Sequence, residues 1–338
     1  MNVPKTSLES SHFPVMLNEV IKISSPEKGG NFLDCTFGGG GYSKLILSFP
    51  KTKIIAIDRD KLAEQKAKDL KKKYLNRFSF HREKFSNLDK VVSKKSNIDK
   101  IIFDLGLSTF QLLDLSRGFS FKAQEKIDMN MGLSSLSAEE VINYYEEKDL
   151  KLIIKLLGNE REASKIVKNI VRARKIKKIS TVKELVEIIK MSKKKNYSKK
   201  INVSTKTFQA LRIFVNKETT ELIKGISKAA KIIKPGGKII VISFHSIEDK
   251  IVKYFFNNFS LNKSKPSRYL PEENLEESTL FEKYNNDLIR PSDEEIKQNP
   301  PSRSAKLRFA TRNNSNFKEP DELERKFKKY IDLESLNA

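Results

Sequence analysis

A run of four glycines, Gly38–Gly41, lies between a segment whose pattern predicts a β-strand, 31–34, and one that predicts a helix from about Tyr42. Glycines let a backbone approach a ligand closely, and the start of a helix presents free N–H groups. Asp34 and Asp58 end the first and second predicted strands. Ligands of doubly wound sheets lie over the carboxyl ends of the strands, and an acid after the second strand can accept ribose hydroxyls. The pattern therefore predicts a nucleoside-binding site.

The type of nucleoside follows from what the glycine run lacks. Tyr42 and Ser43 follow the run, so the third glycine of a dinucleotide fingerprint is absent, and no G-x-x-x-x-G-K-[ST] phosphate loop occurs. S-adenosylmethionine has no phosphate, but its carboxylate can bind at the helix start and its ribose at Asp58. Asp104 ends the fourth predicted strand, where adenine or the methyl donor would lie. A tight turn without a ligand and a nucleotide-dependent oxidoreductase are the disfavoured alternatives.

A second group of polar residues follows a later predicted strand. His245 precedes Glu248 and Asp249, but one histidine with two acids lacks a second soft ligand, so no metal site is expected. Ser246 and Asp249 fit the pattern of a helix cap better. The only cysteine, Cys35, excludes an intramolecular disulfide and is expected to pack at a strand end.

The elements that must position these residues alternate between strand and helix in the first part of the chain. Such alternation predicts βαβ units, a parallel sheet and right-handed crossovers. The Pro235–Gly237 run is expected to end a helix, and residues from Pro320 are expected to form a surface helix. The predicted strands cover residues 31–34, 53–57, 77–81, 99–103, 238–244 and 305–311.

A helical insertion interrupts this sheet pattern. Nothing between about Ser137 and Lys200 is typical of a strand, and the apolar residues recur at helical spacing. We therefore expect an α/β fold with a parallel sheet and an inserted helical domain. The expected division is 1–110 for the first part of the core, 111–203 for a helical RNA-recognition insert, and 204–338 for the second part, with a long loop at about 260–301.

Composition sets limits on partners. The 338 residues contain 66 Lys and Arg against 43 Asp and Glu, a formal net charge of +23. Such an excess favours a polyanionic partner, although solubility or coding bias explains it equally well. No apolar run approaches the length of a membrane helix, and no secretory signal precedes the first strand, so a cytoplasmic protein without membrane contact is expected.

Several motifs, taken together and in order, resemble the ribosomal RNA small-subunit methyltransferase H family, also called MraW. They include a glycine-run motif (34–43), an Ala-Ile-Asp-Arg-Asp segment (56–60), and a Phe-Asp-Leu-Gly-Leu-Ser segment (103–108). The remaining matches are 12–20, 117–121, 127–129, 207–216, 242–249 and 303–308.

The resemblance implies a Rossmann-like class I methyltransferase sheet with an inserted helical domain, and S-adenosylmethionine as the methyl donor. It implies methyl transfer to the exocyclic N4 of a cytidine in the decoding region of 16S ribosomal RNA, within the small subunit. The chain departs from the family at Tyr42, where histidine is usual, at Thr109-Phe110, where Ser-Pro is common, and at Asn130, where arginine is usual. The cofactor contacts that the resemblance implies are Gly40, Gly41, Tyr42, Asp58, Phe85, Asp104 and Gln111.

Methylation of a cytosine amine sets a specific chemical demand. The N4 lone pair is delocalised into the ring, so the enzyme must hold N4 in line with the methyl group and accept a hydrogen bond from the amine. Asp104 is the first candidate acceptor and Ser108 the second. A role of Asp104 in holding the cofactor alone is an equal alternative.

The target base must also leave its stack and be held, which points to aromatic and basic residues after the fourth strand. Phe110, Phe119 and Phe121 are candidate stacking residues, although a core position is more common for each. Arg117, Arg212 and Arg303 are candidate phosphate contacts, with an ordinary surface role equally good for Arg117 and Arg303. His12 is expected either to order the N-terminal segment or to cap a helix.

Two rival functions remain at this point. A non-catalytic RNA-binding ribosome assembly factor on the same fold would show no saturable cofactor binding. The second is a methyltransferase with a DNA or protein substrate. Enzymes that methylate DNA amines usually carry a [DNS]-P-P-[YFW] motif after the fourth strand, where this chain has Asp104-Leu105-Gly106-Leu107. A homo-oligomer is compatible with the sequence, which does not fix the oligomeric state.

Overall fold

The structure is a computed structural model that describes residues 14–93, 97–193, 202–261, 279–286 and 288–337. His12 and the lysine-rich stretch 194–200 lie outside the described residues. No helix in the described ranges is both long and apolar enough to cross a membrane.

A six-stranded sheet forms the centre of the molecule, in the order β3-β2-β1-β4-β5-β6. β1 to β5 run parallel to their neighbours, and β6 runs antiparallel to β5. This order, with β1 and β4 at the centre, confirms the predicted α/β, Rossmann-like architecture. The strands are β1 (Gly30–Asp34), β2 (Thr52–Asp58), β3 (Phe78–Arg82), β4 (Ile98–Asp104), β5 (Ile233–Ser243) and β6 (Lys306–Thr311).

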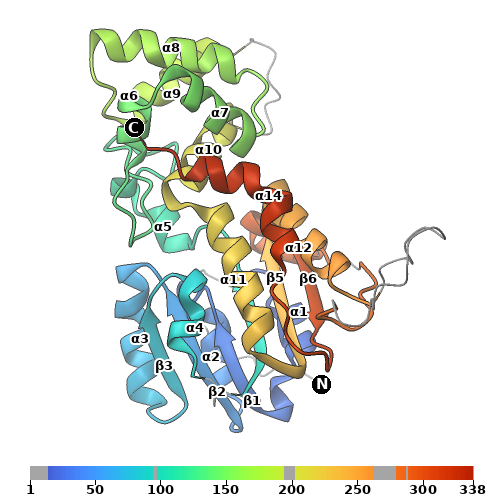
Figure 1. Ribbon diagram of the computed structural model, residues 1–338. Helices are drawn as coiled ribbons and strands as arrows, with labels where there is room; N and C mark the ends of the chain where they lie inside the picture. Colours follow the sequence, from blue (N-terminus) through green and yellow to red (C-terminus); the bar gives the residue numbers. More distant parts are fainter. Residues whose placement is uncertain (1–13, 94–96, 194–201, 262–278, 287, 338) are drawn as a thin grey trace, which may run out of the picture.

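Two apolar cores cover the two faces of the sheet. Successive strand residues point to opposite faces, so Phe32 and Ile102 enter one core while Leu33 and Ile101 enter the other. Figure 1 shows the helices on both sides of the strands. The first core includes residues of α1 (Leu17–Ser24), α2 (Gly41–Leu47) and α3 (Lys61–Lys73). The second includes residues of α4 (Leu88–Val91), α11 (Glu218–Ile232), α12 (Ser246–Asn258) and α14 (Asp321–Glu334).

A group of helices lies between β4 and β5 in the sequence and beyond the carboxyl ends of the strands in space (Figure 1). No strand of the sheet comes from the described residues of this stretch. α10 packs mainly on α7, so a division at residue 203 separates α10 from its main partner. The helices are α5 (Thr109–Leu113), α6 (Ala138–Tyr144), α7 (Glu147–Leu157), α8 (Ala163–Ile176), α9 (Val182–Ser192) and α10 (Thr205–Asn216).

Three local expectations were wrong. α11 ends at Ile232, and Pro235–Gly237 lies within β5, where the pairing with β4 shifts register and Gly236 has φ 75°. α12 is capped by His245, whose ring accepts from the Glu248 N–H while the Glu248 carboxylate accepts from the His245 N–H, so Ser246 is not the cap. The described part of the expected loop 260–301 contains a short helix, α13 (Asp293–Gln298).

The C-terminal helix caps another helix through a buried acid. The Glu334 carboxylate accepts from the N–H groups of Thr219 and Thr220, at 3.0 and 2.8 Å, in the first turn of α11. Burial raises the pKa of Glu334 to about 7, although these hydrogen bonds lower it in part. The contact fixes α14 against the helix that leads into β5.

Replacing this cap gives a prediction for stability. Glu334→Ala leaves two N–H groups of α11 without their acceptor, which costs about 1–2 kcal/mol at pH 5. The folded state binds the Glu334 proton more tightly than the unfolded state does. The contribution of Glu334 to the free energy of unfolding of the wild type therefore falls as pH rises toward 7. The difference between variant and wild type should therefore shrink from pH 5 to pH 8 in urea unfolding curves.

Glu324→Ala is the matched control, because Glu324 lies on the exposed side of α14. If both variants lost the same free energy of unfolding at every pH, the capping role of Glu334 would be contradicted.

Candidate functional site

The glycine run forms a tight connection between β1 and α2. Gly38 and Gly40 have φ 53° and 77°, in the left-handed region that glycine adopts without strain. A Cβ on Gly40 would lie 2.6 Å from the Phe37 ring, and a Cβ on Gly41 would lie 2.2 Å from Cγ of Pro14. Gly39 has open space around it. The loop therefore requires glycine for its positive φ at Gly38 and Gly40, and for close contact with neighbouring side chains at Gly40 and Gly41.

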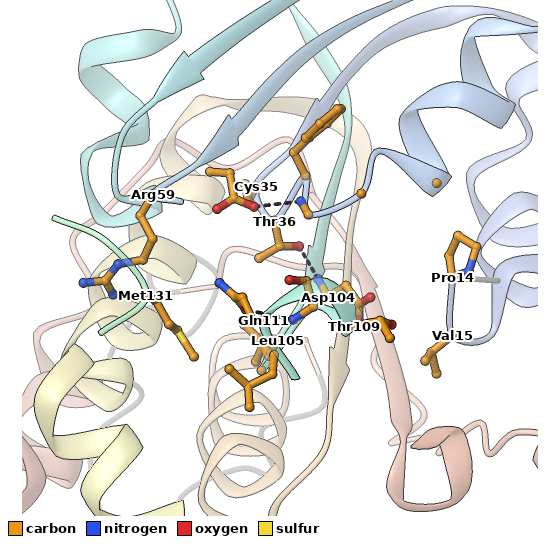
Figure 2. A pocket seen from close by; sticks show the side chains of 18 of the residues that line it. Pro14, Val15, Cys35, Thr36, Arg59, Asp104, Leu105, Thr109, Gln111 and Met131 are labelled. Atoms are coloured by element: carbon orange, nitrogen blue, oxygen red, sulfur yellow. Dashed lines mark hydrogen bonds between the residues drawn. The ribbon is translucent and has the colours of Figure 1, made fainter. Parts of the chain in front are cut away.

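A cavity of about 400 Å³ opens over this loop at the carboxyl ends of β1, β2 and β4. Figure 2 shows Arg59 and Met131 on one side of it, Pro14 and Val15 on the other, and Thr36 and Asp104 between them. The sequence-predicted residues among its lining are Gly41, Tyr42, Asp58, Phe85, Asp104, Ser108, Phe110 and Gln111. Gly40 is buried beneath the loop.

Asp58 connects the glycine loop to the end of β2. Its Oδ2 accepts from the Gly38 N–H at 2.7 Å, and its Oδ1 accepts from the Asp60 N–H at 2.9 Å. A carboxylate offers about four lone-pair positions, so two remain for hydroxyl groups in the cavity. Burial raises the pKa of Asp58 to about 6, although the two backbone N–H groups favour its charged form.

Asp34 and Asp104 end the two central strands and lie close to each other. Asp34 accepts from the Ser43 hydroxyl at 2.7 Å and from the Thr36 N–H at 3.3 Å, and burial raises its pKa to about 6. The Thr36 hydroxyl accepts from the Asp104 N–H at 2.6 Å. Burial and the Asp34 charge raise the pKa of Asp104 to about 8. Its Oδ1 has no hydrogen-bond partner among the described residues.

The loop after β4 is held by an acid at the start of α3. Asp60 Oδ2 accepts from Gln111 Nε2 at 2.7 Å and from Arg117 Nη1 at 2.6 Å. Gln111 Oε1 in turn accepts from the Ser108 N–H at 2.9 Å. The Ser108 hydroxyl oxygen is buried without a partner in the described structure, at the cavity wall.

Two aromatic residues complete the predicted cofactor set. Tyr42 is buried, and its hydroxyl donates to the Val15 carbonyl beside the Asp104 carboxyl. Phe85 packs edge-on to Phe103 with ring centroids 5.5 Å apart, and it borders the cavity from the segment after β3.

Most of the residues predicted to contact RNA form contacts with other residues of the protein. Arg117 pairs with Asp60 and its guanidinium lies 5.3 Å from the Phe119 ring, which is 95% buried. Both Arg212 nitrogens Nε and Nη2 donate to the Glu218 carboxylate at 2.9 Å. These three residues form contacts within the protein, and their contact with RNA stays a prediction. Arg303 is exposed.

Sequence reasoning missed several lining residues. Arg59 donates to the carbonyls of Gly132 and Asn216 at 2.7 and 2.9 Å, which ties β2 to the inserted helices, and its Nη2 is buried without a partner in the described structure. Pro14 and Val15 line the cavity from the N-terminal segment. Arg59 could have been noted from its place directly after Asp58, but the N-terminal contact depends on chain folding that no local pattern encodes.

An acidic group with one histidine lies at the far wall. Ligand atoms of Glu218, His245 and Glu248 lie within 4.8 Å of one another, which is close enough for one cation to contact all three. Arg212, however, already occupies both oxygens of Glu218, and its positive charge disfavours a metal ion there. Asp249, predicted as a cap, instead pairs with Lys306 and Arg308, each at 2.8 Å.

Comparison with known proteins places this site in a family. The model of the MraW methylase family matches residues 9–313. The chain belongs to the MraW methylase family. The six-stranded sheet with its helical insertion is accordingly a Rossmann-like methyltransferase fold.

Named relatives of this methylase span almost the whole chain. A ribosomal RNA small subunit methyltransferase H of Ehrlichia canis (strain Jake) is 42% identical over 302 residues, which covers 88% of this chain and 98% of that protein. One from Rickettsia bellii (strain RML369-C) is 42% identical over 307 residues, with 90% and 99% covered. A solved rRNA methylase from Streptococcus thermophilus aligns with a TM-score of 0.39 at 10% identity, over 87% of this chain and 96% of that one.

The sequence departures of this methylase have clear local contacts. Asn130 accepts from the Gly132 N–H at 2.6 Å and donates to the Ser134 carbonyl at 2.7 Å, so it shapes a turn. The Phe110 ring borders the cavity and lies 5.4 Å from the Lys66 ammonium.

The glycine loop of the methylase yields a paired prediction. Gly40→Ala should lower the free energy of unfolding by about 1–3 kcal/mol, because alanine is strained at this positive φ and its Cβ meets the Phe37 ring. Gly39→Ala should change it by less than about 0.5 kcal/mol, because nothing lies near its Cβ. Chemical denaturation of both variants measures the difference, and equal stabilities would refute this description of the loop.

Proposed function

We propose that this methylase transfers a methyl group from S-adenosylmethionine to the N4 amine of a cytidine in the decoding region of 16S ribosomal RNA. One observation carries the proposal: the glycine loop and the carboxyl groups of Asp58 and Asp104 line one cavity, and the buried Asp34 carboxyl acts electrostatically on Asp104 from behind its wall. The names of the relatives support ribosomal RNA of the small subunit as the substrate. We propose on the same basis that the enzyme acts in the cytoplasm.

The residues around the cavity fit the cofactor. The two free lone-pair positions of Asp58 suit a ribose diol, and the N–H groups at the start of α2 suit a carboxylate. Phe85 offers an apolar edge to a nucleobase. The carboxyl groups at the end of the sheet suit a cationic ligand, and Asp104 Oδ1 has no hydrogen-bond partner among the residues that the structure describes. When bound, S-adenosylmethionine supplies an electrophilic methyl group on a sulfonium.

Asp104 and Ser108 are the candidate acceptors for the amine. In the free protein the Asp104 pKa of about 8 leaves its carboxyl largely protonated at neutral pH. A nearby positive charge favours the ionised form, so cofactor binding converts Asp104 from a donor to an acceptor. The ionised oxygen can then accept a hydrogen bond from N4 and help localise its lone pair. The unpartnered Ser108 hydroxyl offers a second acceptor at the same wall.

The RNA would approach over the basic rim of the cavity. Lys44, Lys66 and Lys84 line it, and their charges suit phosphates that flank the target nucleotide. Phe110, half-buried beside Lys66, is the best-placed ring for stacking on a flipped base. The exposed basic residues of α8 and Arg303 offer further contacts for the small subunit, so the helical insert is proposed to recognise RNA.

The direct test of this function is the content of N4-methylcytidine in small-subunit RNA. Mass-spectrometric mapping of RNA from cells that lack the protein should show loss of one N4-methylated cytidine in the decoding region, restored by the wild-type chain and not by Asp58→Ala. Unchanged methylation would remove the rRNA assignment. Cofactor binding without methylation, or no saturable binding at all, would favour the non-catalytic assembly factor.

Cofactor affinity should depend on pH through Asp104. Because the cation favours the ionised carboxyl, binding releases a proton, and the affinity for S-adenosylmethionine should fall as pH drops below 8, by up to about tenfold per pH unit. Asp104→Asn should remove the pH dependence of the cofactor affinity between pH 7 and 8. Only the pH dependence that comes from Asp34 and Asp58, near pH 6, should remain.

Calorimetric titration at several pH values measures these affinities. S-adenosylhomocysteine, which lacks the sulfonium charge, is the control ligand and should show a weaker dependence. Identical pH profiles for the wild type and Asp104→Asn would exclude this role of Asp104.

A further inference from the structure

We propose that a groove between α12 and α14 binds the phosphodiester backbone of the rRNA substrate, away from the catalytic cavity. The α12–α14 groove encloses about 550 Å³, and no acidic side chain lines it. Its lining consists of four lysines, two asparagines and three aromatic residues: Lys250, Lys253, Asn257, Asn258, Lys326, Lys329, Tyr254, Phe327 and Tyr330. The inference rests on the proposed rRNA substrate.

Helical spacing arranges these donors in two facing rows. On α12, Lys250, Lys253 and Asn257 recur at intervals of three and four residues, so they lie along one face of the helix. On α14, Lys326 and Lys329 are spaced by three. α12 and α14 pack against each other, which brings the two rows to the same groove. Such a track of positive charge suits an extended polyanion better than a small, compact anion.

The ammonium groups of the groove are not neutralised by the protein. None of the four lysines forms an ion pair with a described residue, whereas Lys328, on the same helix, pairs with Asp332 at 2.8 Å. Lys326 lies 5.6 Å from the Tyr254 ring and Lys329 lies 4.9 Å from the Tyr330 ring. The ammonium groups of these two lysines therefore lie over aromatic faces and form no ion pair with a carboxylate of the described residues.

The residues in and around the groove also favour binding of an RNA backbone. Burial raises the pKa of Tyr254, Glu322 raises it further and Arg325 lowers it, so one charge of each sign lies near that end of the groove. The asparagine amides add neutral donors for phosphate oxygens. Of the three rings in the groove, Phe327 and Tyr330 are buried and Tyr254 lies under the Lys326 ammonium. The amides and ammonium groups therefore favour contact with the RNA backbone rather than with base edges.

The position of the groove indicates which part of the substrate it meets. The first turn of α12 lines the catalytic cavity through Glu248, but Lys250, Lys253 and Asn257 point from the side of the helix that faces α14. The groove therefore contacts RNA that flanks the target rather than the target nucleotide. The groove adjoins the helical insert, because α14 also packs on α7 (Figure 1), so it extends the proposed RNA-contacting surface from the insert along α12 and α14.

The test is a full-length variant in which Lys250, Lys253, Lys326 and Lys329 are all replaced by alanine. A matched control replaces four exposed lysines near the amino ends of β1 and β2: Lys22, Lys28, Lys51 and Lys53. Both variants lose the same charge. Binding to a naked 16S rRNA fragment is measured over a range of salt concentrations, together with KM and kcat for small subunits and the affinity for S-adenosylmethionine.

The groove variant should bind rRNA about tenfold or more weakly at 0.1 M salt, and its log–log salt dependence should be shallower by about 3, because each lost phosphate contact removes about 0.7–0.9. KM should rise with kcat and cofactor affinity unchanged, while the control variant matches the wild type.

Equal salt slopes for the groove and control variants would overturn the inference. An effect with intact subunits but none with naked rRNA would also overturn it, because it would assign the groove to an acidic protein partner. Failure of the wild type to bind or methylate rRNA would instead refute the proposed function, which keeps the two outcomes separate.

Discussion

The close placement of three carboxyl groups at adjacent strand ends is the constraint on which the site depends. Asp34, Asp58 and Asp104 end β1, β2 and β4, and parallel pairing brings those ends together. Burial raises the pKa of each, to about 6, 6 and 8. Holding like charges in a low-dielectric site is unfavourable unless a cation or hydrogen-bond donors share it. A sulfonium cofactor with a ribose and an ammonium group meets both needs.

The surrounding structure connects this carboxyl group cluster to the inserted helices. Asp60 joins α3 to the loop after β4 through Gln111 and Arg117, and Arg59 reaches the carbonyls at the start and end of the insert. Asn216 at the end of α10 accepts from the Met131 N–H at 2.8 Å. The helices that are proposed to bind RNA are therefore fixed to the same strand ends that are proposed to bind the cofactor. Such an arrangement would bring the two substrates together at a small cost in conformational entropy.

Much of the fold could be predicted from sequence because its signals are local. The strand ends at Asp34, Asp58 and Asp104 follow from apolar runs that stop at an acid, and the glycine loop follows from composition. The register within β5 could not be predicted, because Pro235–Gly237 also fits a helix end, and only pairing with β4 shows it to lie inside the strand.

The uses of individual charged residues were harder to predict. Arg117 and Arg212 have basic side chains that suit phosphates, but each forms an ion pair within the protein. Arg117 pairs with Asp60, which is distant in sequence, and Arg212 pairs with the nearby Glu218. The same holds for the cap of α12, where His245 replaces the expected Ser246. Tertiary contacts decide such roles, and a single sequence does not display them.

The most direct measurement is a crystal structure of the protein with S-adenosylhomocysteine. The account predicts the ligand in the cavity over Gly38–Gly41, with its ribose hydroxyls on Asp58 and its amine within hydrogen-bond distance of Asp34 or Asp104. A ligand bound at another place, or an Asp58 that keeps only its two backbone contacts while the ribose lies elsewhere, would contradict it.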